Sequence, residues 1–261
     1  MHIRSTSDLS TDLIIDNTEM NYSWPEDYPK LFELYKVAKQ RSLNNFFQEL
    51  ADKIQNTPDF DVFRKLEEGL SVLDSNSWND FKPTVLQCSM KKNEFRGYSQ
   101  LVDCLNEVKG YLYLKEQGYS NIEFIPELST ETPDMQAVFE GQIIALLEVK
   151  TIHVSDNENQ YIIENTDRRT TGRCPIVRDV SLGIPEGLIS KLLSSIEKAR
   201  SQLLNYEPDI NARRIVYLII TLDITLALDQ RNYEELNSFL DRQSDEEVEL
   251  KYCYIRFTHG D

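Results

Sequence analysis

The C-terminal half of the chain alternates strand-length apolar runs with an amphipathic helical segment, and this order restricts the fold more than any other feature. Ile143–Ile152 and Ile215–Leu222 are apolar runs of strand length. Between them, residues 188–206 carry apolar side chains at three- and four-residue steps, which predicts a helix. A near-continuous apolar run such as Ile215–Leu222 is typical of a central strand covered on both faces. The pattern predicts an α/β protein.

The 261-residue chain divides into two compositional parts. Residues 1–90 have helical periodicity over 29–55 and 60–73, between a polar tail at 1–24 and a turn-rich segment at 74–80. We expect a helical N-terminal extension there and an α/β domain over 91–261. In that domain the pattern predicts helices at 101–117, 188–206 and 233–240. It predicts strands at 122–125, 134–139, 143–152, 215–222 and 252–257, and a long loop at 155–186.

Composition and charge limit the classes of protein to which the chain can belong. With 40% apolar and 28% charged residues it has the composition of a globular protein, and no apolar run approaches the ~20 residues needed to span a bilayer. We expect a cytoplasmic protein without a membrane partner. The net charge is −16, yet residues 165–214 hold nine basic and six acidic side chains. The four cysteines lack CxxC spacing, so we expect free thiols and no zinc site.

Asp134, Glu148 and Lys150 lie on two neighbouring predicted strands. Glu148 and Lys150 share one strand face because side chains i and i+2 point the same way, with Val149 on the other face. Asp134 reaches the face of Glu148 through a three-residue loop at 139–141, which pairs Val138 with Gln142, or through a β-bulge. A plain two-residue loop at Glu140-Gly141 places Asp134 on the wrong face.

Two carboxylates on adjacent strands form an oxygen-rich pocket suited to Mg²⁺ or Mn²⁺. Such an ion polarises a phosphodiester oxygen and lowers the pKa of a bound water. A neighbouring lysine orients that water and stabilises the charge that develops on phosphorus. Acid, acid and base in this arrangement favour metal-dependent hydrolysis of phosphodiesters. The alternative is a solvated strand face with an ordinary charge pair.

These residues resemble the PD-(D/E)xK nuclease superfamily, in the form Pro133-Asp134 followed by Glu148-Val149-Lys150. The resemblance covers residues 101–257 and implies a restriction-endonuclease-like mixed sheet flanked by helices. It implies that Asp134, Glu148 and the Val149 carbonyl bind the metal and that Lys150 handles the water. Two further elements fit the superfamily. Glu107, on the helix before the strands, matches an acidic residue that assists the metal site, although a solvated helix residue is the alternative.

Gln202-Leu-Leu-Asn-Tyr206 resembles the QxxxY element of the RecB-type branch and lies on the helix after the strands. Helical steps place Lys191, Lys198, Gln202 and Tyr206 on one polar stripe, which we expect opposite the apolar face and in contact with substrate phosphates. Arg168 and Arg169 in the long loop are further candidates for phosphate contacts, with solubility as the alternative. His153, just past Lys150, is interpreted as incidental.

The sequence therefore predicts a magnesium- or manganese-dependent nuclease that acts on nucleic acid, with DNA favoured over RNA. Defence, mobile-element and repair contexts are all compatible with it. A homodimer or a protein partner is a further expectation, because the chain is acidic on both sides of the basic segment. Two alternatives stay open: a catalytically silent relative that binds nucleic acid or protein, and an N-terminal extension that is itself the functional, regulatory part.

Overall fold

A computed structural model of the chain describes residues 24–42, 44–56, 61–92, 97–126, 131–153, 168, 171–172, 174, 184, 186–208, 211–222 and 230–256. The helices are α1 Trp24–Asp27, α2 Pro29–Arg41, α3 Phe46–Asn56, α4 Asp61–Ser71, α5 Ser75–Cys88, α6 Ser99–Glu116, α8 Glu186–Asn205 and α9 Gln230–Asp241. The strands are β1 Ile122–Phe124, β2 Met135–Phe139, β3 Gln142–Ile152, β4 Arg213–Leu222 and β5 Glu249–Arg256. The predicted α/β class is confirmed.

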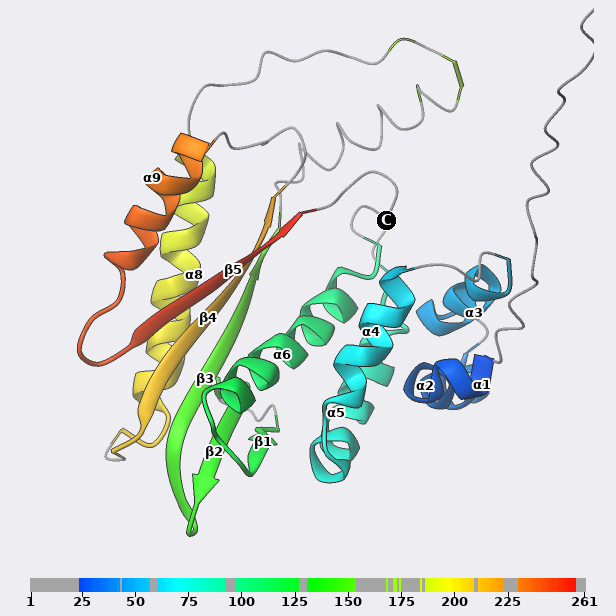
Figure 1. The fold of residues 1–261 in the computed structure, drawn as a ribbon, viewed down its shortest axis with the longest axis horizontal. Coiled ribbons are helices and arrows are strands. Elements are labelled where there is room, and N and C mark those ends of the chain that lie inside the picture. The colour runs from blue at the N-terminus through cyan, green and yellow to red at the C-terminus, as the bar shows by residue number, and fades with distance from the viewer. Residues whose placement is uncertain are drawn as a thin grey trace, which may run out of the picture.

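The five strands form one mixed sheet in the order β1-β2-β3-β4-β5. β1, β2 and β3 pair antiparallel, whereas β3, β4 and β5 pair parallel. Helices α8 and α9 cover one face of the sheet, and α6 covers the other (Figure 1). All five predicted strands are present, with bounds that differ by a few residues at some ends.

Side chains on each strand alternate between the two covered faces. Leu146, Val216 and Leu218 belong to a hydrophobic cluster with α8 and α9. Leu147 and Val149 belong to a second cluster with α6. Both faces of the sheet are buried, which explains why β3 and β4 are apolar almost throughout.

Helix α6 lies very close to the sheet because it presents a glycine there. A Cβ atom on Gly110 would lie 2.6 Å from Cγ2 of Val149 and 2.8 Å from Cδ2 of Leu147. A side chain at position 110 would therefore require either these strand side chains or the helix to shift. Helix α6 also carries Glu107, so this close approach brings that carboxylate near β3.

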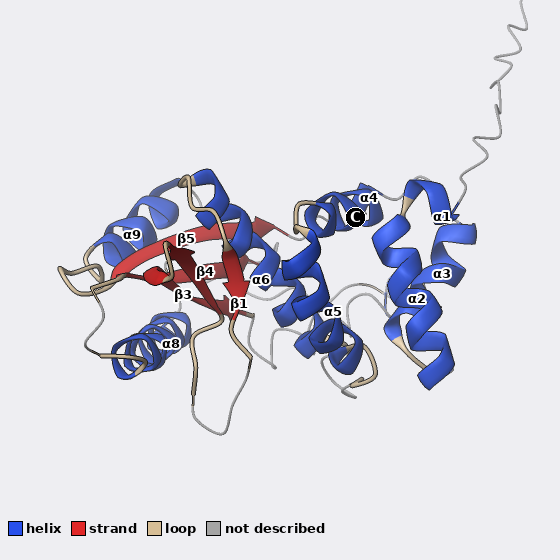
Figure 2. Ribbon diagram, turned by 90° about the horizontal axis from the view of Figure 1, so that it is seen from below, coloured by secondary structure: helices blue, strands red, loops and turns tan. Residues whose placement is uncertain are grey.

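The N-terminal helices lie beside α6, on the side away from α8 (Figure 2). Buried residues of α2 to α5 join the same hydrophobic cluster as α6 and its sheet face. Polar contacts also connect them, since the hydroxyl of Ser77 on α5 donates to the Ile122 carbonyl at 2.9 Å. The domain boundary at residue 90 stays a prediction.

One local prediction in the N-terminal part is wrong. The 74–80 segment is not a turn but the start of α5, because the Asp74 carboxylate accepts from the Ser77 amide at 2.9 Å and caps the helix. The predicted helical pattern over 29–55 is confirmed and is divided between two helices, α2 and α3. Asn45 lies between the two helices, just before α3. Its side-chain oxygen accepts from the Gln48 amide at 3.0 Å, and its side-chain nitrogen donates to the Ser42 carbonyl at 2.6 Å.

A buried carboxylate from another helix caps the start of α2. Glu67 on α4 is only 6% exposed and accepts from the amides of Lys30 and Leu31, both at 2.9 Å. A negative charge at a helix N-terminus satisfies free amides and interacts favourably with the helix dipole. The pair α2–α4 is thereby joined by charge-assisted hydrogen bonds.

Two expectations concern parts of the chain that the structure treats only in part. Residues 1–23 of the predicted tail and most of the loop at 155–186, including Arg169, lie outside the described residues, whereas Trp24 begins α1. Within the described residues, no helix combines the length and apolar character that crossing a membrane requires. All four cysteines are free thiols, as expected, with Cys104 buried and Cys174 exposed.

Candidate active site

The site residues meet where β3 continues past the start of β2. The first paired residue of β2, Met135, lies opposite Leu147, so Asp134 falls next to Glu148 at the point where the ladder ends. Beyond this point β3 keeps β4 as a neighbour on one side. The side of β3 that β2 leaves is called the open edge below.

A β-bulge, and not the three-residue loop, produces this register. Phe139 pairs with Gln142, which leaves Glu140 and Gly141 as a two-residue loop, both with positive φ (51° and 77°). The ladder then shifts between Ala137 and Val138, so that Ile144 has no opposite residue. The prediction of a loop at 139–141 is wrong, and the bulge that was its stated alternative is confirmed.

The Asp134 carboxylate is bound to the open edge. Its Oδ2 atom accepts a hydrogen bond from the Val149 amide at 2.6 Å. The amide and carbonyl of one residue in an extended strand point to the same side, so the Val149 carbonyl also faces this edge. The geometry thus directs two oxygen donors of the predicted metal site, Asp134 and the Val149 carbonyl, to one edge.

Glu148 is a buried acid with one free oxygen. Its side chain is 1% exposed, Oε1 accepts from Lys150 Nζ, and Oε2 has no hydrogen-bond partner among the described residues. Burial, and then repulsion from Asp134, raise the pKa of Glu148 to about 8, although the Lys150 ammonium opposes the shift. This burial contradicts the alternative of a solvated strand face.

Glu107 adds a third carboxylate from the α6 side. Burial is the largest cause that raises its pKa well above the ordinary value, followed by repulsion from Asp134 and then Glu148. The charge of Asp134 therefore disfavours the ionised forms of both Glu107 and Glu148. Within the described ranges, no group of three His, Cys, Asp or Glu side chains is arranged as a ready-made metal cage.

Lys150 is held by two acceptors on the α8 side of the sheet. Its Nζ atom donates to Glu148 and to Oε1 of Gln202, the latter at 2.9 Å. The amide nitrogen of Gln202 donates to the Thr132 carbonyl at 3.3 Å. The prediction that Glu148 and Lys150 share a strand face is confirmed, since Leu147 and Val149 pack on the opposite face.

The polar stripe of α8 differs from its prediction. Gln202 is only 8% exposed and faces the sheet, so its expected place opposite the apolar face is wrong. Tyr206 is half-buried against the α8 cluster, and this burial raises the pKa of its phenol. Gln202 faces the sheet because the ammonium of Lys150 lies beneath the helix, and a partly buried charge requires polar partners.

The lysines predicted to contact phosphate have partners within the chain. Lys191 Nζ donates to the His153 carbonyl at 2.7 Å, at the end of β3. Lys198 Nζ lies 3.2 Å from Oε1 of Glu131, with both side chains more than half exposed. Arg168 donates to the Cys174 carbonyl at 3.4 Å, and Arg169 lies outside the described residues.

Sequence reasoning missed a row of contacts between α6 and the end of β3. Nε2 of His153 lies 2.6 Å from Oδ1 of Asp103, and Asn106 donates to the Thr151 hydroxyl at 3.2 Å. His153 is therefore attached to α6, and its interpretation as incidental to the chemistry stays a prediction. The available signal was the four-residue spacing of Asp103 and Glu107, which places both acids on one side of the helix.

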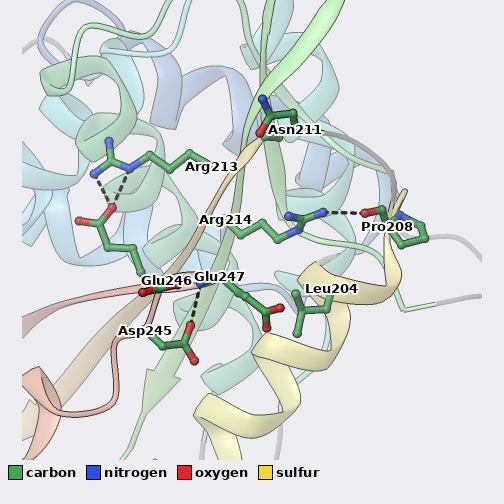
Figure 3. Close-up of a pocket in the computed structure, with 10 residues that line it drawn as sticks. Leu204, Pro208, Asn211, Arg213, Arg214, Asp245, Glu246 and Glu247 are labelled. Carbon is green, nitrogen blue, oxygen red and sulfur yellow. Dashed lines mark hydrogen bonds and ion pairs between the residues drawn. The ribbon is translucent and has the colours of Figure 1, made fainter.

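A separate cavity of about 800 Å³ lies at the start of β4 (Figure 3). Its charged groups serve one another and the backbone: Arg213 donates to Glu249 at 2.6 Å, and Arg214 donates to the Pro208 carbonyl at 3.3 Å. Lys150 is level with Leu218, five residues along β4 from Arg213, which is roughly 16 Å of strand. The cavity is thus distinct from the candidate site.

Comparisons of the chain with models of protein families, with curated proteins and with solved structures find no match.

Proposed function

We propose that the chain is a metal-dependent nuclease with a restriction-endonuclease-like fold. The observation that carries the proposal is the buried Glu148 carboxylate, whose Oε2 atom has no hydrogen-bond partner among the described residues, next to Asp134 and Lys150. A buried carboxyl oxygen without a hydrogen-bond partner is costly, and such features concentrate at functional sites. A bound divalent cation would satisfy this oxygen and favour the ionised forms of the acids.

The donor set suits Mg²⁺ or Mn²⁺, which prefer carboxylate and carbonyl oxygens. Asp134, Glu148 and the Val149 carbonyl would hold the ion, with Glu107 assisting from α6. The bound ion supplies Lewis acidity, polarising a phosphodiester oxygen and lowering the pKa of a water. The raised pKa values of Glu148 and Glu107 support this assignment, because a nearby cation favours their ionised forms.

Lys150 is the residue that would act on the attacking water. Its ammonium lies beside Glu148 and is 23% exposed, so it is accessible yet restrained. It would orient the water and stabilise negative charge developing on the phosphate. Lys191, Lys198, Arg168 and Arg169 would contact neighbouring phosphates, with DNA favoured over RNA as the substrate.

A nuclease assay tests the proposal. Circular and linear duplex DNA, single-stranded DNA and RNA are each incubated with the protein and Mg²⁺, Mn²⁺ or EDTA. Lys150→Ala is the diagnostic variant, and Lys91→Ala, which removes an exposed lysine outside the site, is the matched control. We expect metal-dependent cutting that falls at least about 100-fold in Lys150→Ala and is unchanged in Lys91→Ala.

Metal binding gives a second readout that does not need activity. Calorimetric titration with Mn²⁺ should show a site in the wild type that is lost in Asp134→Asn. Cutting that persists in Lys150→Ala would overturn the assignment of the site. Absence of both cutting and Mn²⁺ binding would favour the alternative, a catalytically silent relative that binds nucleic acid or protein.

A further inference from the structure

Gln202 occupies an unusual place for a polar residue on a long amphipathic helix. It is 8% exposed and lies on the buried side of α8, between the buried Ala199 and Leu203. A buried primary amide is costly unless both of its ends are hydrogen-bonded. Its two ends bind different parts of the site, since Oε1 accepts from Lys150 and Nε2 donates to the Thr132 carbonyl.

Thr132 lies two residues before Asp134, in the segment that leads into β2. The same segment has a second contact with α8, through the Lys198–Glu131 pair. Asp134 in turn binds the Val149 amide, next to Lys150. Gln202 thus closes a ring of contacts that runs from α8 through residues 131–134 to β3 and back through Lys150.

Both polar atoms of the Gln202 amide have partners inside the chain. The Nε2 atom keeps a second N–H, but the side chain is only 8% exposed, which leaves a substrate phosphate little access to it. Lys150, in contrast, carries three N–H donors and uses two of them on Glu148 and Gln202. Among the described residues the third donor of Lys150 has no acceptor, so it can donate to a water or a phosphate oxygen.

We propose that Gln202 is a positioning residue that aims the Lys150 ammonium and ties it to the segment carrying Asp134, and that it does not bind the substrate phosphate itself. This inference rests on the proposed nuclease function for its effect on rate, while the contact with Lys150 is testable without activity. A small misplacement of a reacting group is costly, so the effect appears in kcat and not in KM.

The test compares Gln202→Met, which keeps the length of the side chain and removes both hydrogen bonds, with Gln202→Glu, which keeps an acceptor for Lys150. Ser201→Ala, a neighbouring exposed position on α8, is the matched control. Lysine labelling by isotope-coded acetic anhydride, read by mass spectrometry with Lys36 as the internal reference, reports the contact directly at one pH. Circular dichroism and thermal unfolding verify that each variant folds.

We expect Lys150 labelling to rise roughly 3- to 10-fold in Gln202→Met, the range that loss of one hydrogen bond implies, and to stay near the wild-type rate in Gln202→Glu and Ser201→Ala. With nucleic acid, we expect kcat of Gln202→Met to fall about 10- to 100-fold with KM within about twofold. We expect Gln202→Glu to recover part of this loss.

Unchanged Lys150 labelling in a folded Gln202→Met protein would overturn the proposal. So would a raised KM with an unchanged kcat, which is the signature of a phosphate contact. If the wild-type protein cuts no nucleic acid, the nuclease proposal fails while the labelling result still decides whether Gln202 positions Lys150. The two proposals are therefore separable.

Discussion

At the scale of single residues, the candidate site brings three acids together, and the charge of Asp134 disfavours ionisation of Glu148 and Glu107. Glu148 and Glu107 both have raised pKa values because they are buried and because they face Asp134. Lys150 compensates only part of this, since the Glu148 pKa still lies near 8. Such a concentration of buried acids is a cost to stability that proteins retain at functional sites.

The stability of the metal-free protein should therefore depend on pH through Glu148. The folded-state pKa of about 8 lies above the value in the unfolded chain, so the folded state binds the proton more tightly. This contribution to stability is fully present below about pH 4.5 and is lost as pH rises through about 8. We expect the free energy of unfolding to fall between pH 5.5 and 9, and to fall less steeply in Glu148→Gln. Urea titrations in EDTA at several pH values measure how steeply the free energy of unfolding falls in each protein. Equal pH dependence in the two proteins would contradict a raised pKa at Glu148.

The exposed pair Lys198–Glu131 covers a lysine that the nuclease proposal assigns to phosphate binding. Glu131→Gln removes the competing carboxylate, so we expect KM for nucleic acid to fall by up to about fivefold, the range of an exposed ion pair, with kcat unchanged. Glu197→Gln, an equal change of charge next to Lys198 in the sequence, is the control. Steady-state kinetics at low salt measure KM and kcat for both variants. An equal fall in KM in both would show a general effect of charge and not the release of Lys198.

At the scale of elements, the contact between α6 and β3 depends on one missing side chain. Gly110→Ala forces a methyl group to within 2.6–2.8 Å of Val149 and Leu147. We expect this overpacking to lower the free energy of unfolding by about 1–3 kcal/mol. Gly187→Ala in the first turn of α8, where a Cβ meets no atom within 4 Å, should be neutral or slightly stabilising. Urea unfolding of the two variants tests the difference, and equal stabilities would contradict the close approach.

Helix α5 depends on its cap in a comparable way. Asp74 accepts from the Ser77 amide, and this hydrogen bond is the first cause that lowers the pKa of Asp74. We expect Asp74→Ala to cost about 1 kcal/mol at pH 7 and Asp74→Asn, which keeps the cap, to cost less. Because the Asp74 pKa is lowered, its contribution is present above the unfolded-state pKa and is lost as pH falls through the folded value. The difference between wild type and Asp74→Ala should therefore shrink on acidification, as measured by thermal unfolding from pH 7 to pH 3.

The elements themselves were largely predictable from the sequence. Strand-length apolar runs predicted β3 and β4, and three- and four-residue steps predicted α8, because these periods follow directly from local geometry. Helix α5 was missed because its first turn, Ser75-Asn76-Ser77, is polar and resembles a turn. The helical period begins only after this turn, at the buried positions Trp78, Phe81 and Val85.

At the scale of the whole molecule, the N-terminal helices and the sheet share one core. Buried side chains of α2, α4 and α5 pack in the same cluster as Tyr111 of α6 and Met135 of β2. Tyr111 also donates to the Asp74 carboxylate at 3.2 Å, which joins α6 to the cap of α5. An extension attached in this way contributes to the stability of the sheet, whatever else it does.

Deletion of residues 1–90 should consequently destabilise the protein and not only alter its regulation. Removing α2 to α5 exposes the apolar side of α6, at about 25 cal/mol for each Å² of surface uncovered. We expect residues 91–261 alone to unfold at lower temperature and to bind a hydrophobic dye such as ANS. Thermal unfolding of the truncated and full-length chains measures this. Equal unfolding temperatures would instead favour an independent extension, as in the regulatory alternative.

Local pattern determined the α/β class, the strand positions and the shared face of Glu148 and Lys150. It could not choose between a loop and a bulge, because the bulge at Ile144 depends on how β2 and β3 pack with α6 and α8. It also could not show that Gln202 turns inward, or that Glu67 caps a helix 36 residues away. These outcomes arise from contacts between distant segments. A charged group that is removed from water forms hydrogen bonds with the polar groups that the fold places next to it. The periodicity of the sequence does not show which groups those are.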